Sequence, residues 1–210
     1  MDFDLQSTFE LFREQVSETD VLQWIVLVFG VAQVLLARSN NILLYPAGII
    51  SVVFSVYLLF DVGLYAEAAL NFYYLVMSIY GWWHWIKKSN RPPVKVAFAS
   101  ADEWMTTVVI ISLGWLALYF ILLHLTPSTV PAWDAWVSAT GWAGMWLLAR
   151  RRIENWIVLN VSNAFAIPLL FQKDLPLFGV LTIFLFLVAC KGYFDWRKIY
   201  ARDQAASAYF

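Results

Sequence analysis

Phe54-Ser55-Val56-Tyr57-Leu58-Leu59-Phe60 returns later in the chain as Phe165-Ala166-Ile167-Pro168-Leu169-Leu170-Phe171, at a sequence offset of 111. Apolar stretches match by chance, so repeated Gly, Trp, Arg and Asn residues carry more weight than repeated leucines. At this offset Gly30 is aligned with Gly141, Gly81 with Gly192 and Trp85 with Trp196. Near the first turn the offset between identical residues increases, to 112 for Arg38 and Arg150 and to 114 for Asn41 and Asn155. The pattern predicts an internal duplication.

The composition around this repeat is that of a membrane protein. Hydrophobic residues make up 61% of the 210 residues and charged residues 14%, whereas soluble domains average about 45–50% and about 25%. Cys190 is the one cysteine, and His84 and His124 stand far apart in the sequence, so the sequence predicts neither an internal disulfide nor a metal site. No cofactor is expected.

Seven hydrophobic runs approach the length of about 20 residues that crosses a bilayer. Turn residues and charge clusters separate them, as at Asn90-Arg91-Pro92-Pro93 and Arg150-Arg151-Arg152. We therefore expect an all-α membrane protein with seven transmembrane helices. The expected spans are 22–37, 42–60, 64–86, 104–125, 133–149, 155–171 and 175–196.

The segment 1–20 carries six acidic residues and one basic residue, without the features of a secretory signal. Leu5, Phe9, Phe12 and Val16 recur at helical spacing, which favours an amphipathic helix at the membrane surface, although a disordered acidic tail fits equally well. We divide the rest into a first three-helix repeat (21–88), a loop and linker helix (89–128), a second repeat (129–200) and a cytoplasmic tail (201–210).

Lysine and arginine sort by side if the loops alternate across the membrane. Only Arg13 and Lys173 fall on one side, which the positive-inside rule makes the outside. The rule places the N-terminus outside and the C-terminus in the cytoplasm. The basic side carries Arg38, Lys87, Lys88, Arg91, Lys95, Arg150, Arg151, Arg152, Arg197, Lys198 and Arg202.

A three-helix unit ends on the opposite side of the membrane from where it begins, so a direct repeat would be inverted. The span 104–125 has no counterpart in the repeat. Acting as a linker helix, it would make the two units parallel, related by an axis along the membrane normal. This arrangement predicts a substrate site between the units near the middle of the bilayer.

Polar residues inside spans are the candidates for function, because they cost free energy in lipid unless they are partnered. In the sixth span Trp156, Asn160 and Asn163 share one helical face, and Pro168 is expected to kink the helix. An indole beside two carboxamides suits an aromatic heterocycle with polar substituents. The alternative is that the asparagines only join helices by hydrogen bonds.

The third span carries a second polar stripe, formed by Glu67, Asn71, Tyr74 and Ser78. Glu67 could balance a cationic ligand, or lie close enough to the outer surface to be solvated. Tyr45 corresponds to Trp156 at the offset of 111 and is either the opposite aromatic wall or an interface tyrosine. The predicted substrate-binding residues are Trp156, Asn160, Asn163, Asn71, Tyr74, Glu67 and Tyr45.

A substrate site between two parallel units is typical of a transporter, but two other classes of membrane protein also fit parts of the sequence. Lys191 in the seventh span could hold retinal as a Schiff base, but it lies near the cytoplasmic end, where it can reach water and pair with Asp195 at i+4. A structural or signalling protein without a cavity is the second alternative. No enzyme signature is present, so we do not expect an enzyme.

Two motifs resemble the nicotinamide riboside transporter family (PnuC and its Pnu relatives). Ile79-Tyr80-Gly81-Trp82-Trp83-His84-Trp85 is similar to the close of the family's third helix, and Arg151-Arg152-Ile153-Glu154-Asn155-Trp156 is similar to the entry to its sixth. The resemblance covers all seven helices. It implies a three-plus-one-plus-three fold similar to SWEET proteins, a homotrimer, and facilitated diffusion of an unphosphorylated vitamin that a cytoplasmic kinase traps.

The resemblance also limits which substrates are expected. In nicotinamide riboside members the helix 6 motif is Trp-x-x-Trp with a later Asn; Trp156 and Asn163 match it, but Leu159 occupies the second Trp position. Related Pnu proteins carry thiamine, riboflavin or deoxynucleosides. We expect an inner-membrane uniporter of a vitamin-type aromatic solute, nicotinamide riboside first, with thiamine as the main alternative.

Overall fold

The computed structural model describes residues 5–61, 65–86 and 94–207, and all regular elements in these ranges are helices apart from one isolated parallel bridge between Ala97 and Arg152. The protein is therefore all-helical, as the hydrophobic periodicity predicts. The helices are α1 (Leu5–Glu18), α2 (Val21–Arg38), α3 (Leu44–Asp61), α4 (Tyr65–Trp85), α5 (Ala101–Leu125), α6 (Pro131–Ala149), α7 (Asn155–Gln172) and α8 (Pro176–Ser207).

The helices α2 to α8 follow the seven expected hydrophobic runs closely. The main difference is α8, which continues past the expected end at Trp196 to Ser207 and so includes most of the predicted tail. Ile199 and Tyr200 pack against the core, and the Tyr200 ring meets Phe98 edge to face at 5.1 Å, which gives the extension a reason to stay helical. Of the two alternatives for the N-terminal segment, the helix is correct over Leu5–Glu18.

Helix starts follow local chemistry. Capping boxes begin α2, through Asp20 and Gln23, and α5, through Ser100 and Glu103. Pro131 begins α6 at a position where a missing N–H costs nothing. Four of the described helices are by themselves long and apolar enough to span a membrane, namely α2, α3, α5 and the Pro176–Ala206 part of α8.

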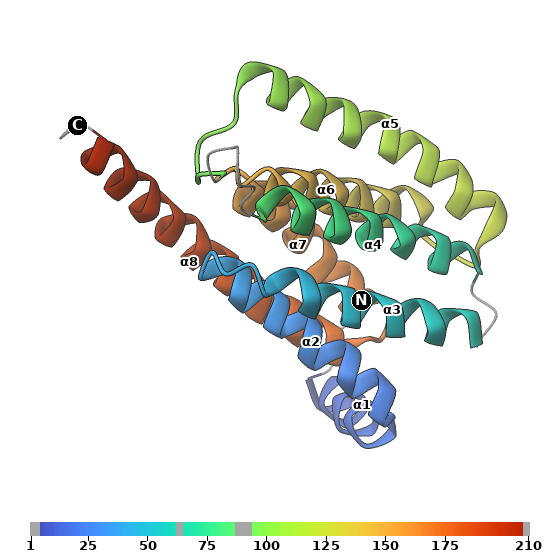
Figure 1. The fold of residues 1–210 in the computed structure, drawn as a ribbon. Coiled ribbons are helices and arrows are strands. Elements are labelled where there is room, and N and C mark those ends of the chain that lie inside the picture. The colour runs from blue at the N-terminus through green and yellow to red at the C-terminus, as the bar shows by residue number, and fades with distance from the viewer. Residues whose placement is uncertain (1–4, 62–64, 87–93, 208–210) are drawn as a thin grey trace.

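Six helices form a closed ring in the order α2, α3, α4, α6, α7, α8, with α8 returning to α2. Two groups of three helices, α2–α4 and α6–α8, meet along two seams, α2–α8 and α4–α6. The helix α5 runs outside the ring against α6, and α1 lies where α2 and α8 begin (Figure 1). We call the end of the ring with Arg38 and the Arg150–Arg152 turn the basic end, and the other end the pocket end.

The turns after α2 and α6 have the same backbone. Asn40 and Arg151 both adopt a positive φ, 52° and 57°. The bond from Asn40 N to Ala37 O has its counterpart, at the offset of 111, in the bond from Arg151 N to Leu148 O. The backbones of the two turns therefore align at an offset of 111. The larger offsets of 112 and 114, which follow from identical residues, do not match structurally equivalent positions.

The same offset holds inside the helix pairs. Ser51 Oγ of α3 donates to Val26 O of α2 at 2.9 Å, and Ser162 Oγ of α7 donates to Val137 O of α6 at 2.7 Å. Ser162 is 111 residues after Ser51, and Val137 is 111 residues after Val26, so the two hydrogen bonds join equivalent positions. The two three-helix groups therefore share interhelical contacts as well as sequence.

The most buried part of the core lies at the basic end. Tyr45 packs over Gly81 and edge to face on Trp85, with the ring centres 5.1 Å apart. Its counterpart Trp156 packs over Gly192 and edge to face on Trp196, at 5.7 Å. A Cβ at either glycine would fall within 2.8 Å of the aromatic ring, so glycine is required for these close approaches.

Candidate functional site

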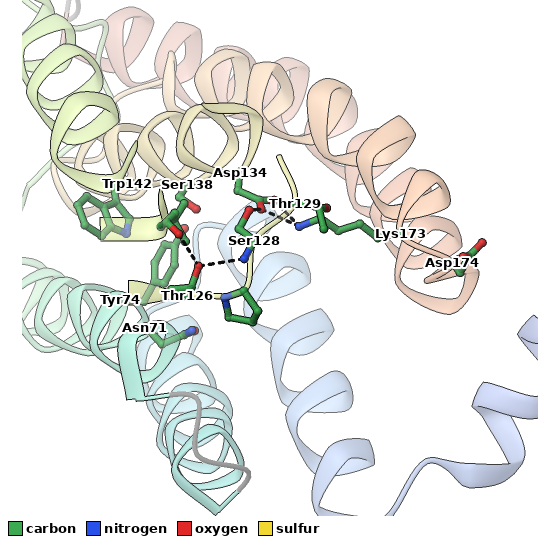
Figure 2. A pocket seen from close by; sticks show the side chains of 12 residues that line it. Asn71, Tyr74, Thr126, Ser128, Thr129, Asp134, Ser138, Trp142, Lys173 and Asp174 are labelled. Carbon is green, nitrogen blue, oxygen red and sulfur yellow. Dashed lines mark hydrogen bonds and ion pairs between the residues drawn. The ribbon is translucent and has the colours of Figure 1, made fainter. Parts of the chain in front are cut away.

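A pocket of about 580 Å³ opens at the pocket end of the α4–α6 seam. Helices α4 and α6 form its sides, and the α5–α6 loop and the α7–α8 turn close around it. Figure 2 shows Asn71 and Tyr74 on one side, facing the loop and α6. Its lining residues are Asn71, Tyr74, Leu122, Thr126, Pro127, Ser128, Thr129, Asp134, Ser138, Trp142, Lys173 and Asp174.

Aromatic contacts fix the wall that α4 shares with α6. The rings of Tyr73 and Trp142 stack with centres 4.5 Å apart and an interplanar angle of 23°, and Tyr73 Oη donates to Trp142 O at 3.0 Å. A Cβ at position 141 would lie only 2.7 Å from Tyr74 Oη, so the glycine there allows Tyr74 to approach α6 this closely. The indole of Trp142 is thus held in place at the edge of the pocket by a neighbour that does not line it.

An ion pair crosses the pocket between α6 and the α7–α8 turn. Lys173 Nζ lies 2.6 Å from Asp134 Oδ1, and Ser128 Oγ donates to Asp134 Oδ2 at 2.5 Å (Figure 2). Both charged side chains are less than one third exposed, so their attraction is screened less than that of a surface pair. The pocket therefore combines an aromatic wall, amide and hydroxyl groups, the Asp134 carboxylate paired with Lys173, and a second carboxylate, Asp174.

The structure brings only part of the predicted set together in this pocket. Asn71 and Tyr74 line it, as the α4 stripe predicts. Ser78 continues the stripe toward the basic end, fully buried, with no hydrogen-bond partner for its Oγ. The side chain of Glu67 lies outside the described part of the structure.

The predicted α7 residues lie elsewhere. Trp156 and Asn160 border a separate groove of about 420 Å³ between α7 and α8, together with Cys190 and Phe194. Asn160 Nδ2 donates to Cys190 Sγ at 3.2 Å, and Asn163 Nδ2 donates to Asn160 Oδ1 at 3.3 Å, so the two amides do interact. The Trp156 ring is almost fully buried, and its Nε1 has no hydrogen-bond partner.

Two further predicted positions lie at the basic end. Tyr45 is fully buried, and no group bonds to its Oη. Lys191 is exposed, and the expected partner Asp195 accepts a hydrogen bond from Arg38 Nε at 2.7 Å. Tyr45 therefore packs in the core at the basic end, and Lys191 lies outside the core.

Asp134, Ser138 and Trp142 are the pocket residues that the sequence analysis missed. They stand at i, i+4 and i+8 on one face of α6, inside the expected span 133–149, just as Asn71 and Tyr74 do on α4. The signal was an ionisable residue within a span, which by itself marks a functional candidate.

The basic turn after α6 is a compact electrostatic cluster. Glu103 of α5 accepts from Arg150 Nε at 3.2 Å and from Arg152 Nε at 2.9 Å, while Glu154 accepts from Ala99 N. Arg151 donates to Val94 O. Burial lowers the pKa of the Arg151 guanidinium from its ordinary value, although an arginine stays protonated at any physiological pH. These bonds attach α5 and the segment before it to the second three-helix group.

A ring of six helices with a polar pocket at the seam between two similar groups is the architecture expected of a polytopic membrane transporter of small solutes. The sequence model described as "Nicotinamide mononucleotide transporter" matches residues 20–198, so the chain belongs to this family. Membership of a transporter family confirms the resemblance drawn from the two motifs and the prediction that the protein is not an enzyme. It also favours transport over the photoreceptor alternative.

Two curated relatives carry the description "Nicotinamide riboside transporter PnuC". Those of Escherichia coli K12 and Shigella flexneri are each 24% identical over 216 residues, which covers 89% of this chain and 90% of the relative. A solved structure described as "Crystal structure of the Vitamin B3 transporter PnuC" superposes with a TM-score of 0.68 at 23% identity, over 96% of this chain and 93% of that one. At this identity the superposition establishes the fold.

Proposed function

We propose that this protein is a uniporter of nicotinamide riboside, a cationic pyridine linked to a ribose. The observation that carries the proposal is the pocket at the α4–α6 seam, which has a fixed indole, amide and hydroxyl groups and a carboxylate. The descriptions of the relatives, which span nearly the whole chain, support the same substrate.

The chemistry of the pocket fits each part of such a ligand. The pyridinium ring can stack on Trp142, where the ring face attracts a cation. The carboxamide and ribose hydroxyls need donors and acceptors, which Asn71 and Ser138 supply from opposite helices. Asp134 offers negative charge, which its pair with Lys173 offsets.

The predicted deeper residues remain part of the proposal. Buried polar atoms normally have hydrogen-bond partners, so the unpartnered Trp156 Nε1 and Tyr45 Oη support a polar ligand contact during passage. Asn163 lies on the side of α7 away from its exposed face, which carries Ile157, Val161, Ala164 and Phe165. We propose that Trp156, Asn160, Asn163, Tyr45 and Glu67 contact the solute after it leaves the pocket.

The proposed topology has seven spans, with α2–α4 and α6–α8 as parallel repeats and α5 as the linker. From the positive-inside rule we propose that the Arg38 and Arg150 turns and the C-terminus lie in the cytoplasm, and the N-terminus outside a bacterial inner membrane. We further propose a homotrimer and a cytoplasmic kinase that phosphorylates the imported solute. The uniport proposal predicts that dissipating a proton gradient leaves exchange in liposomes unchanged.

Leu159 is the observation that favours thiamine as a second candidate. The position where nicotinamide riboside members have their second Trp holds this leucine, and it packs tightly against Gly144 of α6. An indole there would need more space between α6 and α7. Thiamine is also a cationic aromatic and would use Trp142 and Asp134 in the same way.

Calorimetry on the purified protein with nicotinamide riboside, thiamine, riboflavin and a deoxynucleoside decides between the substrates. Nicotinamide riboside should bind most tightly; tighter binding of any other solute would replace it as the substrate. We expect Trp142→Ala to weaken binding of the preferred solute at least tenfold. If the stacking surface is Trp156 instead, Trp156→Ala will show this loss and Trp142→Ala will keep the affinity of the unmodified protein.

A further inference from the structure

The two seams close at the basic end through the same contact, made reciprocally. Trp85 Nε1 of α4 donates to Ala149 O of α6 at 3.0 Å, and Trp196 Nε1 of α8 donates to Ala37 O of α2 at 3.0 Å. Each indole therefore binds the helix end of the other three-helix group. Both side chains are buried, and their ring centres lie only 6.2 Å apart, so together they close the ring below the pocket.

The α2–α8 seam is tied at both of its ends. At the basic end Arg38 Nε lies 2.7 Å from Asp195 Oδ2. At the pocket end Gln15 of α1 donates to Asp174 O at 2.7 Å and accepts from Leu177 N at 3.1 Å, which fixes the start of α8 to the segment before α2. These polar contacts span the seam in addition to the Trp196 bond.

The α4–α6 seam has a different set of ties. Beside the pocket, Tyr73 Oη of α4 donates to Trp142 O of α6 at 3.0 Å. At the basic end Arg150, which follows α6 as Ser39 follows α2, pairs with Glu103 of the linker helix α5 and also hydrogen-bonds Tyr80 of α4. His84 of α4 stands where α8 has Asp195.

Trp85 holds this basic end in two ways. Its N–H binds Ala149 O, and the guanidinium of Arg151 lies 3.9 Å from the centre of its ring. A cation over an indole face is attractive and gains strength when it is desolvated. The same side chain thus joins α4 both to the end of α6 and to the turn that follows.

The α4 stripe leads from the pocket to this residue. Asn71 and Tyr74 line the pocket, Ser78 is buried beyond them without a partner for its Oγ, and Trp85 follows two turns later. The opposite face of α4 is exposed and carries Phe72, Val76, Ile79 and Trp83. A solute that enters the pocket and moves along the stripe therefore meets Trp85 before the basic end.

We propose that Trp85 is the gate residue on the basic side: the α4–α6 seam opens there when Trp85 releases Ala149 and Arg151, while the α2–α8 seam stays closed and acts as the hinge. The inference rests on the transport role of the family and on no particular substrate. Opening exposes the indole N–H and the carbonyl to water, which replaces the lost hydrogen bond, so the gate can alternate between two states of similar free energy.

The test measures how readily a water-soluble reagent from the basic side reaches position 78, which lies on the pocket side of Trp85. A thiol introduced by Ser78→Cys, in a Cys190→Ser background, is treated with a membrane-impermeant maleimide in spheroplasts and in inverted vesicles. Arg202→Cys, at an exposed position on α8 beyond the basic end, reports which preparation presents that side. The labelling needs no ligand. It can therefore disprove the gate while nicotinamide riboside is still the substrate, and it can support the gate even if the substrate is a different solute.

Trp85→Phe removes the N–H and keeps an aromatic ring, and Trp196→Phe is the matched change on the hinge seam. We expect Trp85→Phe to raise labelling of the Ser78→Cys thiol from the basic side about tenfold, the factor that corresponds to a hydrogen bond of about 1.4 kcal/mol. Trp196→Phe should change it less than twofold. Equal increases, no increase, or an increase for Trp196→Phe alone would each overturn the proposal.

Arg151→Asn provides a second variant that keeps the fold of the turn. Asparagine tolerates a positive φ and is the natural residue at the equivalent position 40. Removing the cation above Trp85 should raise labelling about threefold. Unchanged labelling in a properly folded Arg151→Asn protein, as judged by its elution volume and thermal unfolding, would show that Trp85 does not act as this gate.

Discussion

The two seams of the ring have similar backbones but different chemistry at the pocket end. At the α4–α6 seam, α6 presents Asp134 and Ser138 to the pocket. At the α2–α8 seam, the equivalent positions in the first group are Gln23 and Leu27. They line a second cavity of about 420 Å³ that α1 borders, and its lining combines leucines and Val26 with the polar residues Gln15, Glu18, Thr19 and Ser55. The repeated scaffold fixes where a cavity can form, and substitutions at a few lining positions decide which cavity suits a charged polar solute.

The largest effect is expected from glycines that both groups share. Gly81→Ala would press a Cβ into the Tyr45 ring, and Gly192→Ala would place one 2.7 Å from Trp156, both in buried surroundings. Overpacking of this kind costs about 1–3 kcal/mol. Both variants should lower the midpoint of thermal unfolding in detergent, by similar amounts.

Gly114→Ala is the control for these substitutions, because its Cβ would meet its nearest neighbour, Ala139 Cβ, at an ordinary 3.5 Å. Alanine also has a higher helix propensity than glycine. We therefore expect no loss of stability. A large loss for Gly81→Ala beside none for Gly192→Ala would break the equivalence of the two groups.

The sequence predicts the scaffold well because the scaffold depends on patterns that repeat. Hydrophobic length gives seven helices with nearly correct bounds, and the offset of 111 pairs Gly81 with Gly192 and Trp85 with Trp196, which the structure places in equivalent contacts. Membership of the transporter family confirms the functional class. The extension of α8 beyond Trp196 was not predicted, because it depends on long-range packing of Tyr200 against Phe98.

The site is predicted less completely, for a physical reason. Helical spacing says which residues share a face, but the neighbour of that face depends on how the helices close into a ring. The α4 stripe faces the pocket, so Asn71 and Tyr74 lie beside it, whereas Trp156 and Asn160 turn toward α8. Their roles in binding remain predictions, and the Asp134–Lys173 pair could be found only once α6 and the α7–α8 turn were in place.

A charge change sharpens the contrast between the two cavities. Lys173→Met removes the partner of Asp134 and leaves its carboxylate available to a cationic ligand. Both side chains are partly exposed, so screening limits the gain, and we expect a roughly fivefold increase in affinity for nicotinamide riboside by calorimetry. Asp134→Asn should weaken the same binding by a similar factor.

The control lies at the other seam, where Gln23→Glu introduces a carboxylate at the position equivalent to Asp134. The described residues that line this cavity include no indole on which the solute could stack, and we propose that it binds no substrate, so nicotinamide riboside affinity should stay within twofold. An increase comparable to that of Lys173→Met would mean that both seams bind the solute, and the proposed specialisation would be wrong.

The smallest effect comes from the serines that join the first two helices of each group. Ser51→Ala and Ser162→Ala each remove one interhelical hydrogen bond, to Val26 O and Val137 O. Such bonds in membrane proteins contribute about 0.6 kcal/mol on average, so each variant should lose about that much in reversible unfolding in detergent. Ser112→Ala, at an exposed position on α5, should lose nothing. If the losses of unfolding free energy in Ser51→Ala and Ser162→Ala instead differ by more than about 1 kcal/mol, well above that average, equivalent hydrogen bonds contribute different free energies. The two groups would then share their backbone geometry but not the strength of their helix contacts.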